Sequence, residues 1–164
     1  MTDRNDLTER EIVSTRIFPM PRGPIFDAFR DPEQLKRWWG PDGFTNTFQK
    51  FDLRPGGVWQ FIMHGPDGTD YHNESEFVEV VEPVRIIFEH RKPIHGFRMT
   101  ITLDEQDGST KLRWAMLFDS VEECEKVKVF VPAANEQNFD RLERHLATSI
   151  PKKSLAGRVS EGKN

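Results

Sequence analysis

The stretch FRMTITLDEQDGSTKLRWAMLF, residues 97–118, decides the fold class of this 164-residue chain. On both sides of Asp107-Gly108, apolar and polar side chains alternate with a period of two, which is typical of half-buried β-strands. Asp-Gly is a favoured hairpin turn because both residues tolerate positive φ angles. The segment therefore predicts two antiparallel strands, at 97–105 and 110–118, with one apolar face and one polar face.

The same alternation continues toward the N-terminus of the chain. Short breaks rich in glycine and proline separate the apolar runs, so consecutive strands should pair as an antiparallel meander. The further strands are expected at 11–18, 45–53, 57–64, 70–82 and 84–90.

Helices are expected between the first two strands and after the last one. Two short helices should cover 21–29 and 32–39, the second capped by Asp31 with Pro32 in the first helical position. Ser120 and Glu123 form a capping box, and a longer helix should run from near Pro132 to near Thr148.

This order of elements, β-α-α-β6-α, predicts an α+β fold in which a curved antiparallel sheet of about seven strands surrounds a long C-terminal helix. The charged segment 1–10 is expected to be a disordered leader and 11–148 a single domain. Residues 151–164 are expected to form a disordered tail.

Composition and charge exclude several classes of function. The net charge of −4 gives no reason to expect nucleic acid or an anionic membrane surface as a partner. No apolar run approaches the roughly 20 residues of a membrane span, and residues 1–11 lack the pattern of a signal peptide. Cys124 is the only cysteine, which excludes an intrachain disulfide. A cytoplasmic monomer or homodimer without membrane insertion is therefore expected.

Several polar side chains fall on the rows that alternation assigns to the inner face of the sheet: Gln49, Tyr71, Asn73, Ser75 and His90. In a dry core each would need a hydrogen-bond partner, whereas a cavity lets a ligand or water satisfy them. One helix also covers less area than seven strands offer. A cavity is favoured over a solid core, which remains the alternative.

The predicted lining combines aromatic, sulfur-containing and polar side chains from the inner face with two residues of the long helix. These residues are Trp59, Phe61, Met63, Tyr71, Asn73, Phe88, His90, Phe97, Met99, Trp114, Asn135 and Phe139. The pair Trp38-Trp39 is interpreted as packing, with a gate at the cavity entrance as the alternative.

No catalytic residue, metal site or cofactor is predicted. Ser75 and His90 lie on nearby inner rows, but no nucleophile elbow accompanies them. His90 and His95 flank a proline-containing loop, and a third metal ligand would have to come from Glu74 or Glu89. Glu89 points away from His90 by alternation. One histidine in an apolar pocket would suffice for acid–base chemistry, which keeps an enzyme open as an alternative.

The segment Asp31–Phe44, DPEQLKRWWGPDGF, resembles the opening of bacterial relatives of the C-terminal domain of the heat-shock protein 90 ATPase activator. Similar matches follow in DLRPGGVW (52–59), GPDGT (65–69), FVEVVEP (77–83) and DRLERHL (140–146). The resemblance covers residues 11–148 and implies the helix-grip fold of the SRPBCC superfamily, which is START-like and birch-pollen-allergen-like. The chain departs from many relatives at Ala133-Ala134-Asn135, where they carry Glu-Gly-Gly or Glu-Gly-Trp.

The resemblance implies a cavity between sheet and helix that holds lipids, polyketides, hormones or other apolar molecules. Binding of a small hydrophobic ligand, whether lipid, aromatic or polyketide-like, is therefore the first hypothesis, with Tyr71, Asn73 and His90 orienting its polar group. The second is a cyclase or hydrolase with His90 or His95 as base and Tyr71 as donor. The third is a module that interacts with a chaperone, as the name-giving activator does.

Overall fold

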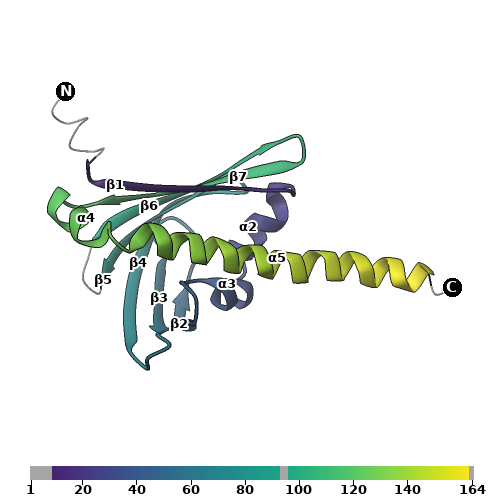
Figure 1. Cartoon of the computed structure of the whole chain (residues 1–164), viewed down its shortest axis with the longest axis horizontal. Helices are drawn as coiled ribbons and strands as arrows, with labels where there is room; N and C mark the ends of the chain where they lie inside the picture. The colour runs from purple at the N-terminus through teal and green to yellow at the C-terminus, as the bar shows by residue number, and fades with distance from the viewer. Residues whose placement is uncertain (1–8, 93–95, 163–164) are drawn as a thin grey trace.

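The computed structural model describes residues 9–92 and 96–162 of the chain. Seven antiparallel strands form one curved sheet in the order β1-β7-β6-β5-β4-β3-β2 (Figure 1). Their bounds are β1 Glu11–Phe18, β2 Thr45–Phe51, β3 Val58–His64, β4 Asp70–Val81, β5 Arg85–Lys92, β6 Phe97–Gln106 and β7 Ser109–Phe118. The hairpin expected at 97–118 is confirmed, with its turn at Asp107-Gly108.

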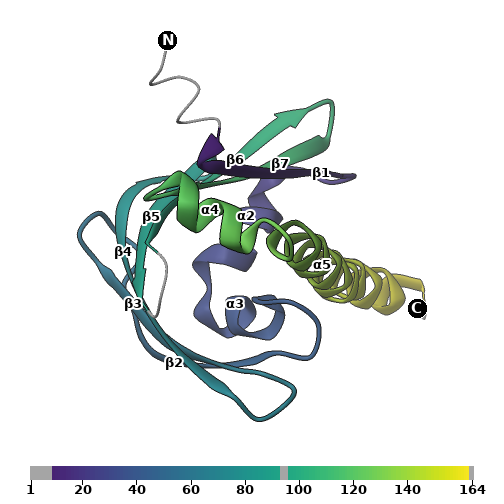
Figure 2. The ribbon, with the colours of Figure 1, turned by 60° about the vertical axis from the view of Figure 1, so that its left-hand side comes forward.

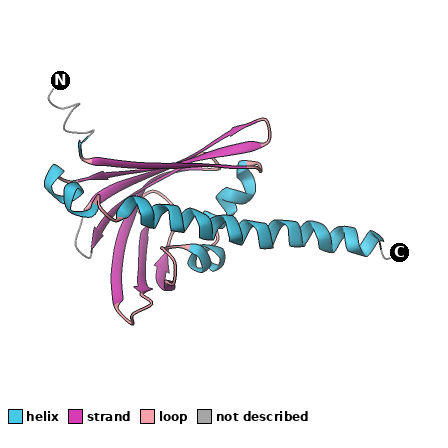
Figure 3. Cartoon of the chain, in the orientation of Figure 1, coloured by secondary structure: helices cyan, strands magenta, loops and turns pink. Residues whose placement is uncertain are grey.

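Four helices accompany the sheet in the described part of the chain: α2 Arg22–Arg30, α3 Pro32–Trp38, α4 Val121–Val127 and α5 Val131–Gly162 (Figure 3). Figure 2 shows the sheet curving around α3 and the near part of α5, so these helices lie on its concave side. The expected caps are confirmed. The Asp31 side chain accepts a hydrogen bond from the Glu33 amide at 3.0 Å, and Ser120 Oγ accepts one from the Glu123 amide at 3.1 Å.

Two details of the sequence interpretation are corrected. The last helix does not end near Thr148 but continues as α5 to Gly162, with Pro151 inside it. Gln49 does not belong to the inner row. A register shift between Phe48 and Lys50 adds one residue to β2, which turns Phe48 toward Trp59 and leaves Gln49 exposed on the other face. The division into leader, domain and tail stays a prediction.

Burial of large aromatic rings between sheet and helices builds the core. Trp38, Trp59 and Trp114 are almost completely buried. Phe139 and Leu142 of α5 are fully buried against them and are spaced as the apolar face of a helix requires. Fully burying one such side chain contributes roughly 1.5–3 kcal/mol, so this cluster fixes how α5 lies across the sheet.

Candidate functional site

A cavity of about 210 Å³ lies between the concave face of the sheet and the first turns of α5. Strands β3 to β7 supply most of its wall, and the segment after α3 closes one side. The described residues of its lining include no lysine, arginine, aspartate or glutamate. The lining consists of Trp39, Gly40, Pro41, Trp59, Phe61, Met63, Asn73, Ser75, Phe88, His90, Phe97, Met99, Trp114, Met116, Ala134, Asn135 and Asn138.

The structure brings together all of the sequence-predicted lining residues except Tyr71 and Phe139. Tyr71 lies near the outer end of β4, where its side chain is 39% exposed and its ring is 6.0 Å from that of Phe44. Phe139 is fully buried behind Trp114, with ring centroids 5.0 Å apart. Tyr71 thus lies beyond the cavity, and Phe139 packs behind the cavity wall.

Aromatic rings form the deep part of the wall. Trp39 stacks on Trp114 at 5.2 Å with an interplanar angle of 19°, and it meets Trp59 edge-on at 5.0 Å. Trp59 in turn stacks on Phe61 at 4.4 Å. These contacts restrict one another's rotamers, so the wall is rigid and preformed.

The two adjacent tryptophans have different surroundings. Trp38 does not line the cavity: its indole N–H donates to the Ala28 carbonyl at 3.1 Å and its ring packs on Phe29. The packing interpretation therefore holds for Trp38. Trp39 is 8% exposed and contributes directly to the cavity wall.

One side of the cavity is polar. Asn73 donates from Nδ2 to the Tyr71 carbonyl at 2.9 Å, which leaves its Oδ1 as the acceptor facing His90 Nε2 at 2.8 Å. In this arrangement His90 Nε2 is the donor to Asn73 Oδ1. Asn73 orients His90 in the wall in this way.

Ser75 faces His90 across β4 and β5 but makes no hydrogen bond with it. Among the described residues, Ser75 Oγ has no partner at all, although the side chain is only 2% exposed. The indole nitrogens of Trp59 and Trp114 are likewise buried without a partner there. Ser75 and His90 are thus not assembled as nucleophile and base.

The segment at residues 39–41 is held in place by α5. Asn138 donates to the Trp38 carbonyl at 2.7 Å and accepts from the Gly40 amide at 3.1 Å. Arg141 donates to the carbonyls of Trp39, Gly40 and Pro41, each within 3.1 Å. Burial lowers the pKa of this guanidinium, which stays charged at any ordinary pH.

The predicted lining did not include seven residues of the observed one: Trp39, Gly40, Pro41, Ser75, Met116, Ala134 and Asn138. Asn138 follows Asn135 by three positions, so helical spacing alone places both on one face and was a usable signal. Gly40 has φ +100°, a backbone conformation that is strained in residues with a side chain. No turn motif in the sequence predicts this conformation. The place of Gly40 in the wall follows from the tertiary contacts.

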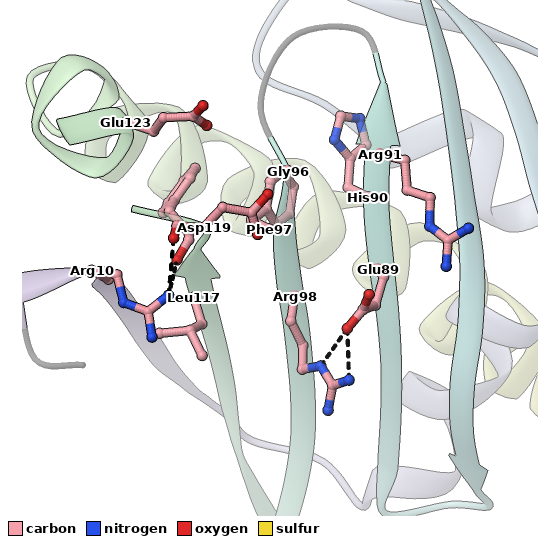
Figure 4. Close-up of a pocket in the computed structure, with 11 residues that line it drawn as sticks. Arg10, Glu89, His90, Arg91, Gly96, Phe97, Arg98, Leu117, Asp119 and Glu123 are labelled. Carbon is pink, nitrogen blue, oxygen red and sulfur yellow. Dashed lines mark hydrogen bonds and ion pairs between the residues drawn. The ribbon is translucent and has the colours of Figure 1, made fainter. Parts of the chain in front are cut away.

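A second, larger hollow of about 490 Å³ lies where β5, β6 and β7 meet α4 (Figure 4). Several charged groups in its walls already have hydrogen-bond partners. Arg98 donates to Glu89 at 2.6 and 2.8 Å, and Arg10 donates to the carbonyls of Phe118 and Asp119 at 2.8 and 3.3 Å. This hollow is therefore a polar, charged surface, unlike the cavity beneath α5.

The two hollows share a wall at His90 and Phe97, whose rings stack at 4.8 Å. The rim of the larger one includes Arg91 and Gly96, which flank residues 93–95. Those three residues, and with them His95, lie outside the described part of the chain, so we assign this hollow no function.

Within residues 9–92 and 96–162, no cluster of three or more histidine, cysteine or acidic side chains is arranged to hold a metal ion. In the same ranges, no helix has the length and hydropathy of a membrane-spanning segment. Thr47, His64 and Asp70 form a hydroxyl–imidazole–carboxylate chain with two contacts of 2.7 Å. These three side chains lie at the solvent-exposed ends of three strands and line neither hollow.

Residues 19–147, well over half of the chain, match the family model described as activator of Hsp90 ATPase homolog 1-like protein. Comparison with curated proteins gave no match.

Solved structures share the fold. A solution structure from Arthrobacter aurescens has TM-score 0.80 and 21% identity, covering 88% of this chain and 90% of that one. A crystal structure from Nitrosomonas europaea has TM-score 0.78 and 21% identity, covering 85% and 96%. One from Mycobacterium smegmatis has TM-score 0.75 and 27% identity, covering 86% and 93%. The helix-grip architecture expected from the sequence is thereby confirmed.

Proposed function

The chain belongs to the family of activator of Hsp90 ATPase homolog 1-like proteins, and we propose that it binds a small, mostly apolar molecule between the sheet and α5. The fold is consistent with ligand-binding modules and with modules that activate Hsp90. The observation that favours binding is the cavity itself, which has a rigid aromatic wall and one polar side.

Energetics support this proposal over a merely imperfect core. Native interiors are packed to crystal density, with few voids larger than a water molecule. The cavity of about 210 Å³ leaves aromatic and sulfur-containing side chains of its wall without packing partners on one side, which forfeits contact energy. An apolar guest that fills the space restores these contacts.

The matched pair Ala134→Phe and Ala133→Phe tests the proposal. Ala134 lines the cavity, whereas Ala133 is the exposed neighbour on the same turn of α5. Both variants add the same side chain to the same helix, but only Ala134→Phe fills the space. Binding should therefore be lost in Ala134→Phe and kept in Ala133→Phe.

The measurement is native mass spectrometry together with thermal melts against lipids, aromatic compounds and polyketide-like compounds. A ligand at a hundred times its Kd stabilises the folded state by about 2.7 kcal/mol, which raises Tm by roughly 5–10 °C for a chain of this size. We expect this shift in the wild type and in Ala133→Phe. A well-folded wild type that retains no guest and shifts with no compound contradicts the proposal.

A second candidate, a chaperone-contact module, is favoured by one exposed feature. Val129 and Phe130, at the corner between α4 and α5, are 85% and 57% exposed. Adjacent apolar side chains so exposed are candidates for contact with another protein. The test is the ATPase rate of Hsp90 with the wild type and with the double variant Val129→Ser/Phe130→Ser. Stimulation that the double variant loses would favour this candidate.

A further inference from the structure

We infer that Asn135 selects the ligand and that its Oδ1 accepts a hydrogen bond from a hydroxyl or N–H group on the guest. The inference rests on the function proposed above and narrows its ligand class to apolar molecules that carry a hydrogen-bond donor. Three observations carry it: the orientation of the Asn135 amide, the accessibility of its oxygen, and the engagement of the other amide oxygens in the lining.

Contacts with two strands hold the Asn135 amide in one orientation. Asn135 lies in the first turns of α5, lines the cavity and is only 8% exposed. Its Nδ2 donates to Ser14 Oγ on β1 at 3.2 Å and to Met116 Sδ on β7 at 3.6 Å. A thioether sulfur accepts but cannot donate, so a reversed amide would place its oxygen against the sulfur without a hydrogen bond. The nitrogen therefore faces these two acceptors, and the oxygen is left for another donor.

Asn135 Oδ1 is an acceptor that a guest can reach. Within the described part of the chain, no side chain or backbone N–H donates to this oxygen. Unlike Ser75 Oγ and the indole nitrogens of Trp59 and Trp114, it is not one of the polar atoms that are closed off from solvent. Because the cavity is open to solvent, water or a guest that enters it has access to this oxygen.

The other two asparagines of the lining have oxygens that are already engaged. Asn73 Oδ1 accepts from His90 Nε2 at 2.8 Å, and Asn138 Oδ1 accepts from the Gly40 amide at 3.1 Å. Among the described residues of the lining, Asn135 is thus the one whose side-chain amide oxygen is available to a guest.

An available acceptor selects for a donor on the ligand. Water can hydrogen-bond to Oδ1, and a guest that displaces this water must donate in its place or leave the oxygen unpaired. A hydroxyl or an N–H group meets this requirement. An ether, a ketone, an ester or a hydrocarbon does not, and neither does a carboxylate, which only accepts.

Two pairs of probes isolate the donor. Indole and benzofuran have nearly the same shape, but only indole carries an N–H. The isomers 1-octanol and heptyl methyl ether are both chains, but only the alcohol carries a hydroxyl. Because one pair is a ring system and the other a chain, the comparison does not depend on the shape of the guest. Binding is measured by calorimetry on the full chain.

We expect indole and 1-octanol to bind the wild type roughly five- to thirtyfold more tightly than their partners, as one unsatisfied buried acceptor implies. Asn135→Leu removes the amide at similar volume and should bring both affinity ratios close to one. A loss of packing alone would weaken both members of a pair equally and leave the ratios unchanged. Gln137→Leu is the matched control. It removes an amide from the same helix that lies outside the cavity lining and accepts from the Asp42 amide at the surface, so both ratios should stay at their wild-type values.

Asn135→Ala repeats the test if Asn135→Leu does not fold. Where neither pair binds, the same comparison uses the panel compound that binds most tightly and its O-methyl or N-methyl derivative. Equal affinity within the pairs, a preference that survives in the folded Asn135 variant, or tightest binding of a compound without a hydroxyl or N–H overturns the inference. In each of these cases the proposed function stands, since a guest binds and Ala134→Phe blocks it. Only the absence of any guest overturns both.

Discussion

Replacing Asn138 with alanine should destabilise the protein by about 3 kcal/mol. The Asn138 amide makes two buried hydrogen bonds, to the Trp38 carbonyl at 2.7 Å and from the Gly40 amide at 3.1 Å. Alanine leaves both backbone groups buried and unpartnered. Each unpartnered group costs about 1–3 kcal/mol, so the two together cost about 2–6 kcal/mol. Water that enters the space left by the side chain partly hydrates both groups, which places the expected loss in the lower half of that range.

Equilibrium unfolding in urea, followed by tryptophan fluorescence and circular dichroism, measures this loss. The unfolding midpoint should fall while the dependence on denaturant stays the same, because the surface exposed on unfolding does not change. A loss of about 3 kcal/mol corresponds to a decrease in Tm of roughly 6–12 °C for a domain of this size.

The neighbouring residue provides the control. Gln137 lies on the same helix and accepts a hydrogen bond from the Asp42 amide at 3.1 Å, but that bond is at the surface. Gln137→Ala should therefore change stability by no more than about 0.5 kcal/mol. The reasoning is refuted if Asn138→Ala costs less than about 1 kcal/mol, or if the two variants lose the same amount.

Two further predictions concern the β2–β3 turn and α5. Gly57→Ala should cost about 3 kcal/mol or more in urea unfolding, since its Cβ would be 1.9 Å from the Asp52 carbonyl oxygen. Gly23→Ala, with no atom within 4 Å, should be neutral or slightly stabilising. Burial lowers the pKa of His145 below its ordinary value near 6.5, so the unfolded chain takes up the proton first as the pH falls. Stability should therefore fall as the pH drops below about 6.5. His145→Gln, which can still donate to Gln34, should flatten that part of the stability–pH curve, and an unchanged slope would contradict this.

The sequence was sufficient where local chemistry decides structure. Alternation at 97–118 predicted β6 and β7, and the caps at Asp31 and Ser120 predicted the starts of α3 and α4. It failed at Gln49, because one extra residue in a strand reverses the faces of its neighbours without changing the composition. Pattern also cannot tell how far along a strand a cavity extends. Tyr71 has the correct parity for the inner face but lies beyond the end of the cavity.

The sequence also could not predict which side chains hold the cavity wall in place. Asn138 and Arg141 hold the backbone at residues 37–41 across about a hundred positions of the chain. Such contacts depend on where α5 lies relative to α3, which the packing of the core determines. The residue types indicated a polar helix face, but not which carbonyls it would meet.

The pairing of β1 with β7 has a consequence for how the protein is made. Glu11 is aligned with Leu117 and Phe18 with Thr110, so the first strand pairs with a partner roughly a hundred residues later. During synthesis, β1 leaves the ribosome long before β7 exists. Until β7 has been synthesised, β1 has no strand to pair with. Closing a loop of roughly a hundred residues between the two strands also slows folding. Folding of this domain is therefore expected to finish only after β7 has been synthesised, and the exposed early strand is the part most dependent on protection from aggregation.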